Sequence, residues 1–173
     1  MKNKLLQIKP QDLILALKLV VLPDRNWRMT DVADSLFISQ SEVSNGLERL
    51  LSAKLVDAEK KKVLAANLFE FLVHGLKYVF PGTLGSVQRG MPTAYSAKPV
   101  STFVNETGIP VVWPWSEGEV RGETLAPLYP TLPMAAAQDD ALYELLVLCD
   151  TIRIGRAREH KFAVQELKKR LIG

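Results

Sequence analysis

The residues best suited to chemistry in this 173-residue chain form a polar run between positions 39 and 49. The run contains hydroxyls, amides and one guanidinium, which are groups that hydrogen-bond to base edges in the major groove of DNA. Its members are Ser39, Gln40, Ser41, Ser44, Asn45 and Arg49. Arginine suits guanine, amides suit adenine, and the free N–H groups at a helix start suit a phosphate oxygen. A second basic set, Lys60, Lys61 and Lys62, suits the flanking backbone or the minor groove.

The elements that must position these side chains follow from apolar spacing and from capping residues. A first helix is predicted over about residues 10–21, because it begins with a proline and carries apolar residues at helical spacing. Thr30 is predicted to cap a short helix over residues 31–36. Ser39 with Glu42 three residues later has the pattern of a capping box and predicts a third helix. The residues of that helix expected to face inward are Val43, Leu47, Leu50 and Leu51.

A small hairpin and a fourth helix complete this half of the chain. Residues 55–57 and 62–64 are β-prone and flank a polar turn, so they predict two short paired strands. Asn67 is predicted to cap a helix that runs to about Val79. The order helix, helix, tight turn, helix, hairpin, helix is that of a winged helix domain, in which the third helix reads DNA and the hairpin is the wing.

Residues 10–80 resemble the winged helix regulators of the MarR-like superfamily. The resemblance rests on residues 30–50, on Leu55 and Val56, and on the lysine-bearing hairpin. It implies a bacterial transcription factor, usually a homodimer, whose recognition helix starts near Ser39. Two features depart from the pattern. Glu42 and Glu48 place negative charge on a helix expected to approach phosphates, and Gly46 weakens the helix by about 1 kcal/mol.

The second half of the chain is less regular in its pattern. Residues 82–91 are predicted to be loop, and residues 92–137 an irregular segment with β-prone runs at 100–104 and 109–113. Residues 139–171 return to helical spacing, with a break expected at Gly155. The predicted fold class is therefore α+β: a winged helix domain over residues 1–80, then a domain over residues 81–173 for dimerisation, partner or ligand contact.

Charge is distributed unevenly along the sequence. Residues 1–80 carry a net charge of +3, residues 81–150 a net of −5, and residues 151–173 a net of +5. The arginines at 153, 156 and 158 could line a phosphate-binding surface or pair internally, for instance with Asp150. Internal pairing is favoured, because the charges of the two adjacent segments nearly cancel.

Several classes of function find no support in the sequence. Cys149 lies in an apolar run and is predicted to be a buried structural thiol. No catalytic constellation, cofactor fingerprint or metal-ligand cluster is recognisable, so no enzymatic activity, cofactor or metal is expected. No apolar run reaches the ~18 residues that span a bilayer, and no signal peptide is evident, which predicts a cytoplasmic protein.

The expected function is that of a sequence-specific transcriptional regulator, acting as a homodimer on double-stranded DNA and repressing transcription. Residues 139–171 are expected to form the dimer or partner interface. An alternative is an antitoxin-like or accessory protein whose winged helix binds a protein partner, such as one encoded by a neighbouring gene. Residues 78–81, 89–94 and 150–159 resemble proteins that are paired with nucleotidyltransferase-like partners.

Overall fold

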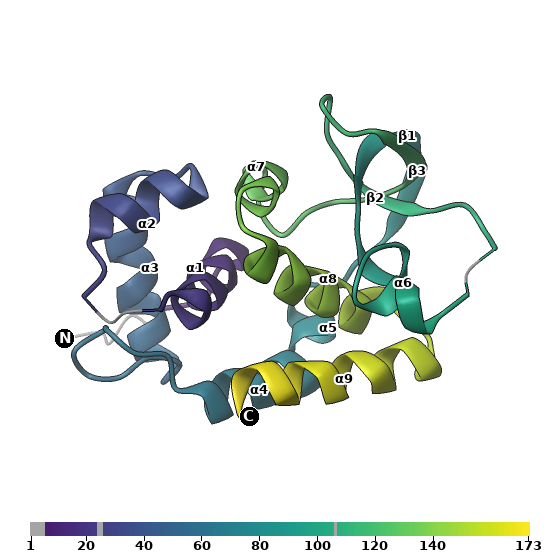
Figure 1. The fold of residues 1–173 in the computed structure, drawn as a ribbon. Helices are drawn as coiled ribbons and strands as arrows, with labels where there is room; N and C mark the ends of the chain where they lie inside the picture. The colour runs from purple at the N-terminus through teal and green to yellow at the C-terminus, as the bar shows by residue number, and fades with distance from the viewer. Residues whose placement is uncertain (1–5, 24–25, 106) are drawn as a thin grey trace.

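The computed structural model describes residues 6–23, 26–105 and 107–173, and it shows a mixed α+β fold (Figure 1). The first three helices are α1 (Pro10–Val21), α2 (Met29–Leu36) and α3 (Gln40–Ser52). Proline stands at the first position of α1, where its missing N–H costs nothing. Helix α3 begins after Ser39, whose hydroxyl accepts the N–H of Glu42 at 3.1 Å. The predicted cap of α3 is therefore confirmed.

Residues 55–64 form the lysine hairpin, which is closed by one antiparallel bridge between Val56 and Val63. The helical stretch that follows divides at Gly75 into α4 (Ala65–His74) and α5 (Leu76–Val79). Two predicted caps are wrong. Helix α2 begins at Met29, so Thr30 lies within it. Helix α4 begins two residues before Asn67, whose amide instead donates to the carbonyl of Lys54 at 2.8 Å.

Three strands follow: β1 (Leu84–Pro92), β2 (Val111–Pro114) and β3 (Val120–Leu125). Strand β1 pairs antiparallel with both others, while β2 and β3 pair in parallel, so the three strands close on themselves. The prediction of loop over residues 82–91 is wrong, because β1 occupies most of that segment. Gly90 allows the backbones of β1 and β2 to lie close together and does not form a turn. A Cβ at this position would lie 1.9 Å from the carbonyl oxygen of Trp113.

The connections around the strands are short helices. A 3-10 turn covers Ala94–Ser96, α6 covers Val100–Phe103, and α7 covers Leu132–Ala137. The β-prone run at 100–104 is thus helical, and that prediction is wrong. The run at 109–113 largely coincides with β2, as expected.

The last two helices are α8 (Asp140–Ile154) and α9 (Ala157–Leu171), separated at Gly155 as predicted. Figure 1 shows α2 and α3 at one end of the molecule, the three strands at the other, and α8 between them. A single hydrophobic cluster runs from α1 through α8 to α9, so the core crosses the predicted domain boundary at residue 80. Cys149 is fully buried in it, as expected, and burial raises the pKa of its thiol.

The apolar faces of α8 and α9 are used inside the chain. Most of the residues that gave these helices their apolar spacing are buried there: Leu142, Leu145, Leu146, Cys149, Leu167 and Leu171. Phe162 is half-buried and stacks on Phe103 of the same chain. The expectation of a dimer interface over residues 139–171 rested on these side chains, which are not available to a second copy. Among the helices that the structure describes, none combines the length and the apolar character needed to cross a membrane.

Candidate nucleic-acid interface

The outer face of α3 is a row of small polar side chains. Val43, Leu47 and Leu50 are buried against the core, as predicted from their spacing. The members of the polar run that remain exposed are Ser39, Gln40, Ser41, Ser44 and Asn45. The hydroxyls of Ser39 and Ser41 lie 3.0 Å apart at the start of the helix. Five of the six predicted contact residues of this run therefore share one accessible surface.

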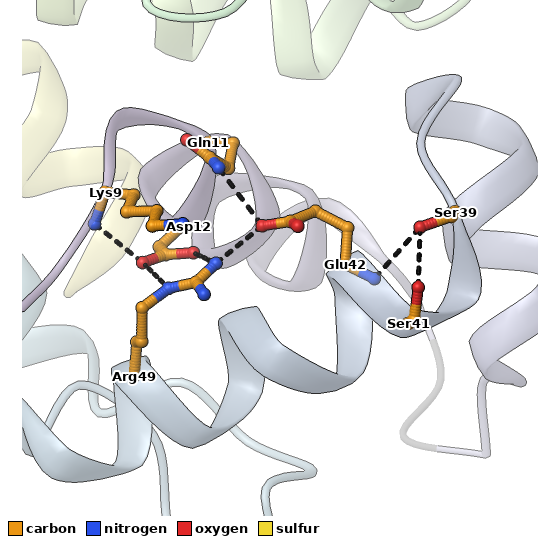
Figure 2. A network of polar contacts seen from close by, with 7 residues as sticks. All are labelled: Lys9, Gln11, Asp12, Ser39, Ser41, Glu42 and Arg49. Carbon is orange, nitrogen blue, oxygen red and sulfur yellow. Dashed lines mark hydrogen bonds and ion pairs between the residues drawn. The ribbon is translucent and has the colours of Figure 1, made fainter. Parts of the chain in front are cut away.

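Arg49 is not part of that surface, so the prediction that its side chain faces outward from α3 is wrong. Its side chain points toward α1, where Nε and one terminal nitrogen each donate to a carboxylate oxygen of Asp12 at 2.8 Å (Figure 2). The same terminal nitrogen donates to Glu42 at 2.6 Å. Arg49 is only 9% exposed, and the hydrogen bonds that it donates to Asp12 are the main reason that the pKa of its guanidinium is raised. These two nitrogens are therefore directed into the protein and away from the exposed side chains of α3.

Gly46 is the position that allows this packing. A Cβ at Gly46 would lie 2.9 Å from a methyl carbon of Leu15 and 3.0 Å from a carboxylate oxygen of Asp12. Helix α1 therefore packs tightly against α3 beside Gly46, and the Asp12–Arg49 pair lies at the same crossing. The loss of helix propensity at this glycine is offset by the close contact that it permits.

The two glutamates of α3 do not oppose an anionic ligand in the way that the sequence suggested. Glu42 accepts a hydrogen bond from the Gln11 amide at 3.1 Å and a second from Arg49 (Figure 2). The bond from Gln11 is the largest cause of the lowered pKa of Glu42, and Arg49 adds to it. Glu48 forms an ion pair with Lys60 of the lysine hairpin. Both charges are thus compensated by basic or polar neighbours.

The lysine hairpin lies beside the outer face of α3, to which the Lys60–Glu48 pair connects it. Its turn is held by Asp57, whose carboxylate accepts the backbone N–H of Lys61 at 2.8 Å and of Lys62 at 3.1 Å. The ammonium of Lys61 lies 4.3 Å from the ring centroid of Trp27. Lys61 and Lys62 are exposed, so two of the three predicted lysines remain accessible to an anion.

Of the three arginines near the start of α9, one forms the internal ion pair that the sequence favoured. Arg153 donates to Asp150 at 2.7 Å and to the carbonyl of Phe80 at 2.9 Å. Arg156 and Arg158 are exposed, and the guanidinium of Arg158 lies 5.1 Å from the ring centroid of Phe103. Arg153 therefore serves the fold, whereas its two neighbours face solvent.

Sequence reasoning missed the residues that orient the interface. Asp12 and Gln11 hold Arg49 and Glu42 from α1, and Trp27 holds the lysine hairpin through its ring and through an N–H donated to the Lys61 carbonyl at 3.3 Å. Asp12 offered one signal, an acidic residue in the first helical turn, which marks a helix start and not a partner 37 residues away. Within the part of the chain that the structure describes, no cluster of His, Cys, Asp and Glu could hold a metal ion.

Comparison of the chain with known proteins gives no match among family models, among curated proteins or among solved structures.

Proposed function

We propose that residues 10–80 form a winged helix that binds duplex DNA, with α3 in the major groove and the lysine hairpin as the wing. One observation carries the proposal. Helix α3 exposes a row of hydroxyls and amides, and Glu48, the carboxylate on this outer side, is covered by a lysine from the hairpin. A surface of this kind offers hydrogen bonds to base edges without repelling the phosphates.

Each side chain of the interface has a distinct role in this proposal. Gln40 and Asn45 present amides, which pair with adenine in the major groove. Ser39 and Ser41, with the free N–H groups of the α3 N-terminus, bind a backbone phosphate. Lys61 and Lys62 contact the flanking backbone and contribute affinity independent of sequence. Arg49 positions α3 against α1 and reads no base.

The biological role that we propose is reversible occupation of an operator, with repression of transcription. Two copies would place their α3 helices in successive major grooves about 34–36 Å apart, on half-sites related by twofold symmetry. Because the apolar faces of α8 and α9 are buried in the chain, such a dimer must associate through other surfaces.

Selection of binding sites from a random duplex library tests the proposal. We expect a defined site, bound more weakly at ~200 mM than at ~50 mM salt by at least one order of magnitude. Gln40→Ala and Asn45→Ala should each weaken binding to the selected site by about 5- to 150-fold, the discrimination that one amide–base pair supplies. Gln165→Ala, which removes an exposed amide on α9, is the matched control and should bind like the unmodified protein.

Two results would overturn the proposal. One is absence of DNA binding at the lower salt concentration, which would favour the alternative that this surface binds a protein partner. The other is equal affinity of the Gln40, Asn45 and Gln165 variants for the selected site. In that case the amides on the outer face of α3 would not contribute to recognition of the DNA sequence.

A further inference from the structure

A surface hollow of about 270 Å³ lies between the end of α1, the residues around Trp27 and helix α2. Its walls combine apolar and polar side chains, and the apolar ones include the indole ring of Trp27. The lining residues are Lys18, Leu22, Pro23, Asn26, Trp27, Asp31, Val32 and Ser35. An apolar cavity of about 150 Å³ is enough to hold benzene. The hollow therefore has room for one ring with a small substituent.

The charged residues of the lining already have partners. Lys18 donates to Asp139 at 2.6 Å, and its side chain is only 12% exposed. Asp31 accepts hydrogen bonds from Arg28 at both carboxylate oxygens, each at 3.0 Å. An anion that entered beside Lys18 would be repelled by the carboxylate of Asp139. The hollow therefore favours an uncharged occupant.

Lys18 nevertheless keeps the capacity to bind an acceptor. An ammonium group has three N–H donors, and within the described part of the chain this one bonds to Asp139 alone. A largely buried donor without a partner costs free energy, which an acceptor atom on a ligand recovers. The group that complements the lining is therefore an oxygen that accepts a hydrogen bond and carries no charge.

We propose that this hollow binds a small uncharged ring compound with one acceptor oxygen, such as an aryl ketone. The ring packs against Trp27 and Val32, and the oxygen accepts a hydrogen bond from Lys18. Trp27 also connects the site to the lysine hairpin, because its N–H donates to the Lys61 carbonyl at 3.3 Å and its ring lies 4.3 Å from the Lys61 ammonium. A ligand that packs against this ring changes the hairpin contact. The site itself does not depend on DNA binding.

Titration of the unmodified protein with acetophenone, followed by ¹H–¹⁵N NMR, tests the proposal. We expect saturable shifts of the Trp27 indole N–H and of the Lys61 amide, with a Kd on the order of 1 mM for so small a ligand. Loss of the indole signal in Trp27→Phe assigns it. The indole signal of Trp113 is the internal control and should not move, because β2 lies at the other end of the molecule from α2 (Figure 1). Benzoate, a charged ring compound, should bind at least about tenfold more weakly.

A double variant tests the role of the ammonium. Lys18→Met/Asp139→Asn removes both charges together, and asparagine keeps the cap of α8. It should weaken acetophenone binding about tenfold and leave isopropylbenzene, a ring of similar size without the oxygen, within about twofold. Lys169→Met removes a lysine that pairs with Glu166 outside the lining, and it should bind both compounds like the unmodified protein.

Four results would overturn the proposal. They are no saturable binding of acetophenone, shifts at Trp113 and not at Trp27, tighter binding of benzoate than of acetophenone, and equal weakening of acetophenone and isopropylbenzene in the double variant. The last would mean that the variant had lost the shape of the hollow and not a donor. Selective loss of acetophenone binding supports the proposal. DNA binding is measured separately, so failure of this site leaves the proposed function standing.

Discussion

Arg49 and Arg153 both end on a buried aspartate, but the two pairs are assembled differently. Arg153 reaches Asp150, three residues earlier on α8, and its side chain is 5% exposed. Asp150 also accepts hydrogen bonds from Trp113 at 2.6 Å and from Thr93 at 2.7 Å. Arg49 reaches Asp12 on another helix, its side chain is 11% exposed, and it keeps a second carboxylate, Glu42. The Asp150–Arg153 pair is local to one helix, whereas the Asp12–Arg49 pair joins two helices that are distant in sequence.

The difference shows when an arginine can be assigned from sequence. The i,i+3 spacing of Asp150 and Arg153 makes them neighbours on any helix, so internal pairing is an available prediction. Asp12 and Arg49 are neighbours only because α1 crosses α3 beside Gly46. From sequence alone, an arginine on a helix that suits DNA binding is therefore predicted to contact a base. Its carboxylate partner on the crossing helix is known only from the structure.

The largest effect should come from Asp150→Ala. This change leaves Arg153 without its carboxylate in a buried site and removes the acceptor of both Trp113 and Thr93. We expect a loss of about 3–5 kcal/mol in the free energy of unfolding, measured by urea denaturation. Asp140→Ala removes an exposed acid from the first turn of the same helix and should cost less than about 1 kcal/mol. Equal losses in the two variants would contradict a special role for Asp150.

A smaller effect is expected at the distant pair. Asp12→Ala should cost about 2–3 kcal/mol, less than Asp150→Ala, because Arg49 retains Glu42. Adding Arg49→Met to Asp12→Ala should cost less than the sum of the single changes, with a coupling of about 1–2 kcal/mol in a double-mutant cycle. The folded double variant should also keep the base preference of the unmodified protein. A relaxed preference, worth 1–3 kcal/mol at one base pair, would restore Arg49 as a reader.

The smallest effect concerns pH and the second carboxylate of Arg49. The Gln11 hydrogen bond, aided by Arg49, holds the pKa of Glu42 below its ordinary value of 4.5. The unfolded chain therefore binds this proton more readily, so the stability that Glu42 contributes is present above about pH 4.5 and is lost as pH falls through its folded pKa.

Glu42→Gln should remove this component of the acid sensitivity. Comparing urea denaturation near neutral pH and at about pH 3.5, we expect the drop in stability to be smaller by a few tenths of a kcal/mol in the variant. Glu70→Gln, an exposed position on α4, is the control and should follow the unmodified protein. An identical pH profile for Glu42→Gln and the unmodified protein would show that the network around Arg49 contributes no stability through Glu42.

The first half of the fold was largely predictable because its signals are local. Helical spacing gave α1, the serine cap gave the start of α3, and two β-prone runs gave the hairpin. Residues 82–125 were less predictable, because their glycines serve close contacts between strands. At Gly90 the reason lies in Trp113, which is 23 positions away and meets it only once β1 and β2 pair.

Arg49 excepted, the sequence by itself determined which side chains of α3 and of the hairpin can face solvent, since helical periodicity and turn chemistry are properties of neighbouring residues. Only the tertiary structure decided which charges are free. It turned Arg49 inward to Asp12, compensated Glu48 with Lys60, and placed the end of α9 beside Lys61 and Lys62. The physical reason is that electrostatic partners are set by distance in space, and helix crossings that bring distant residues together have no local signal.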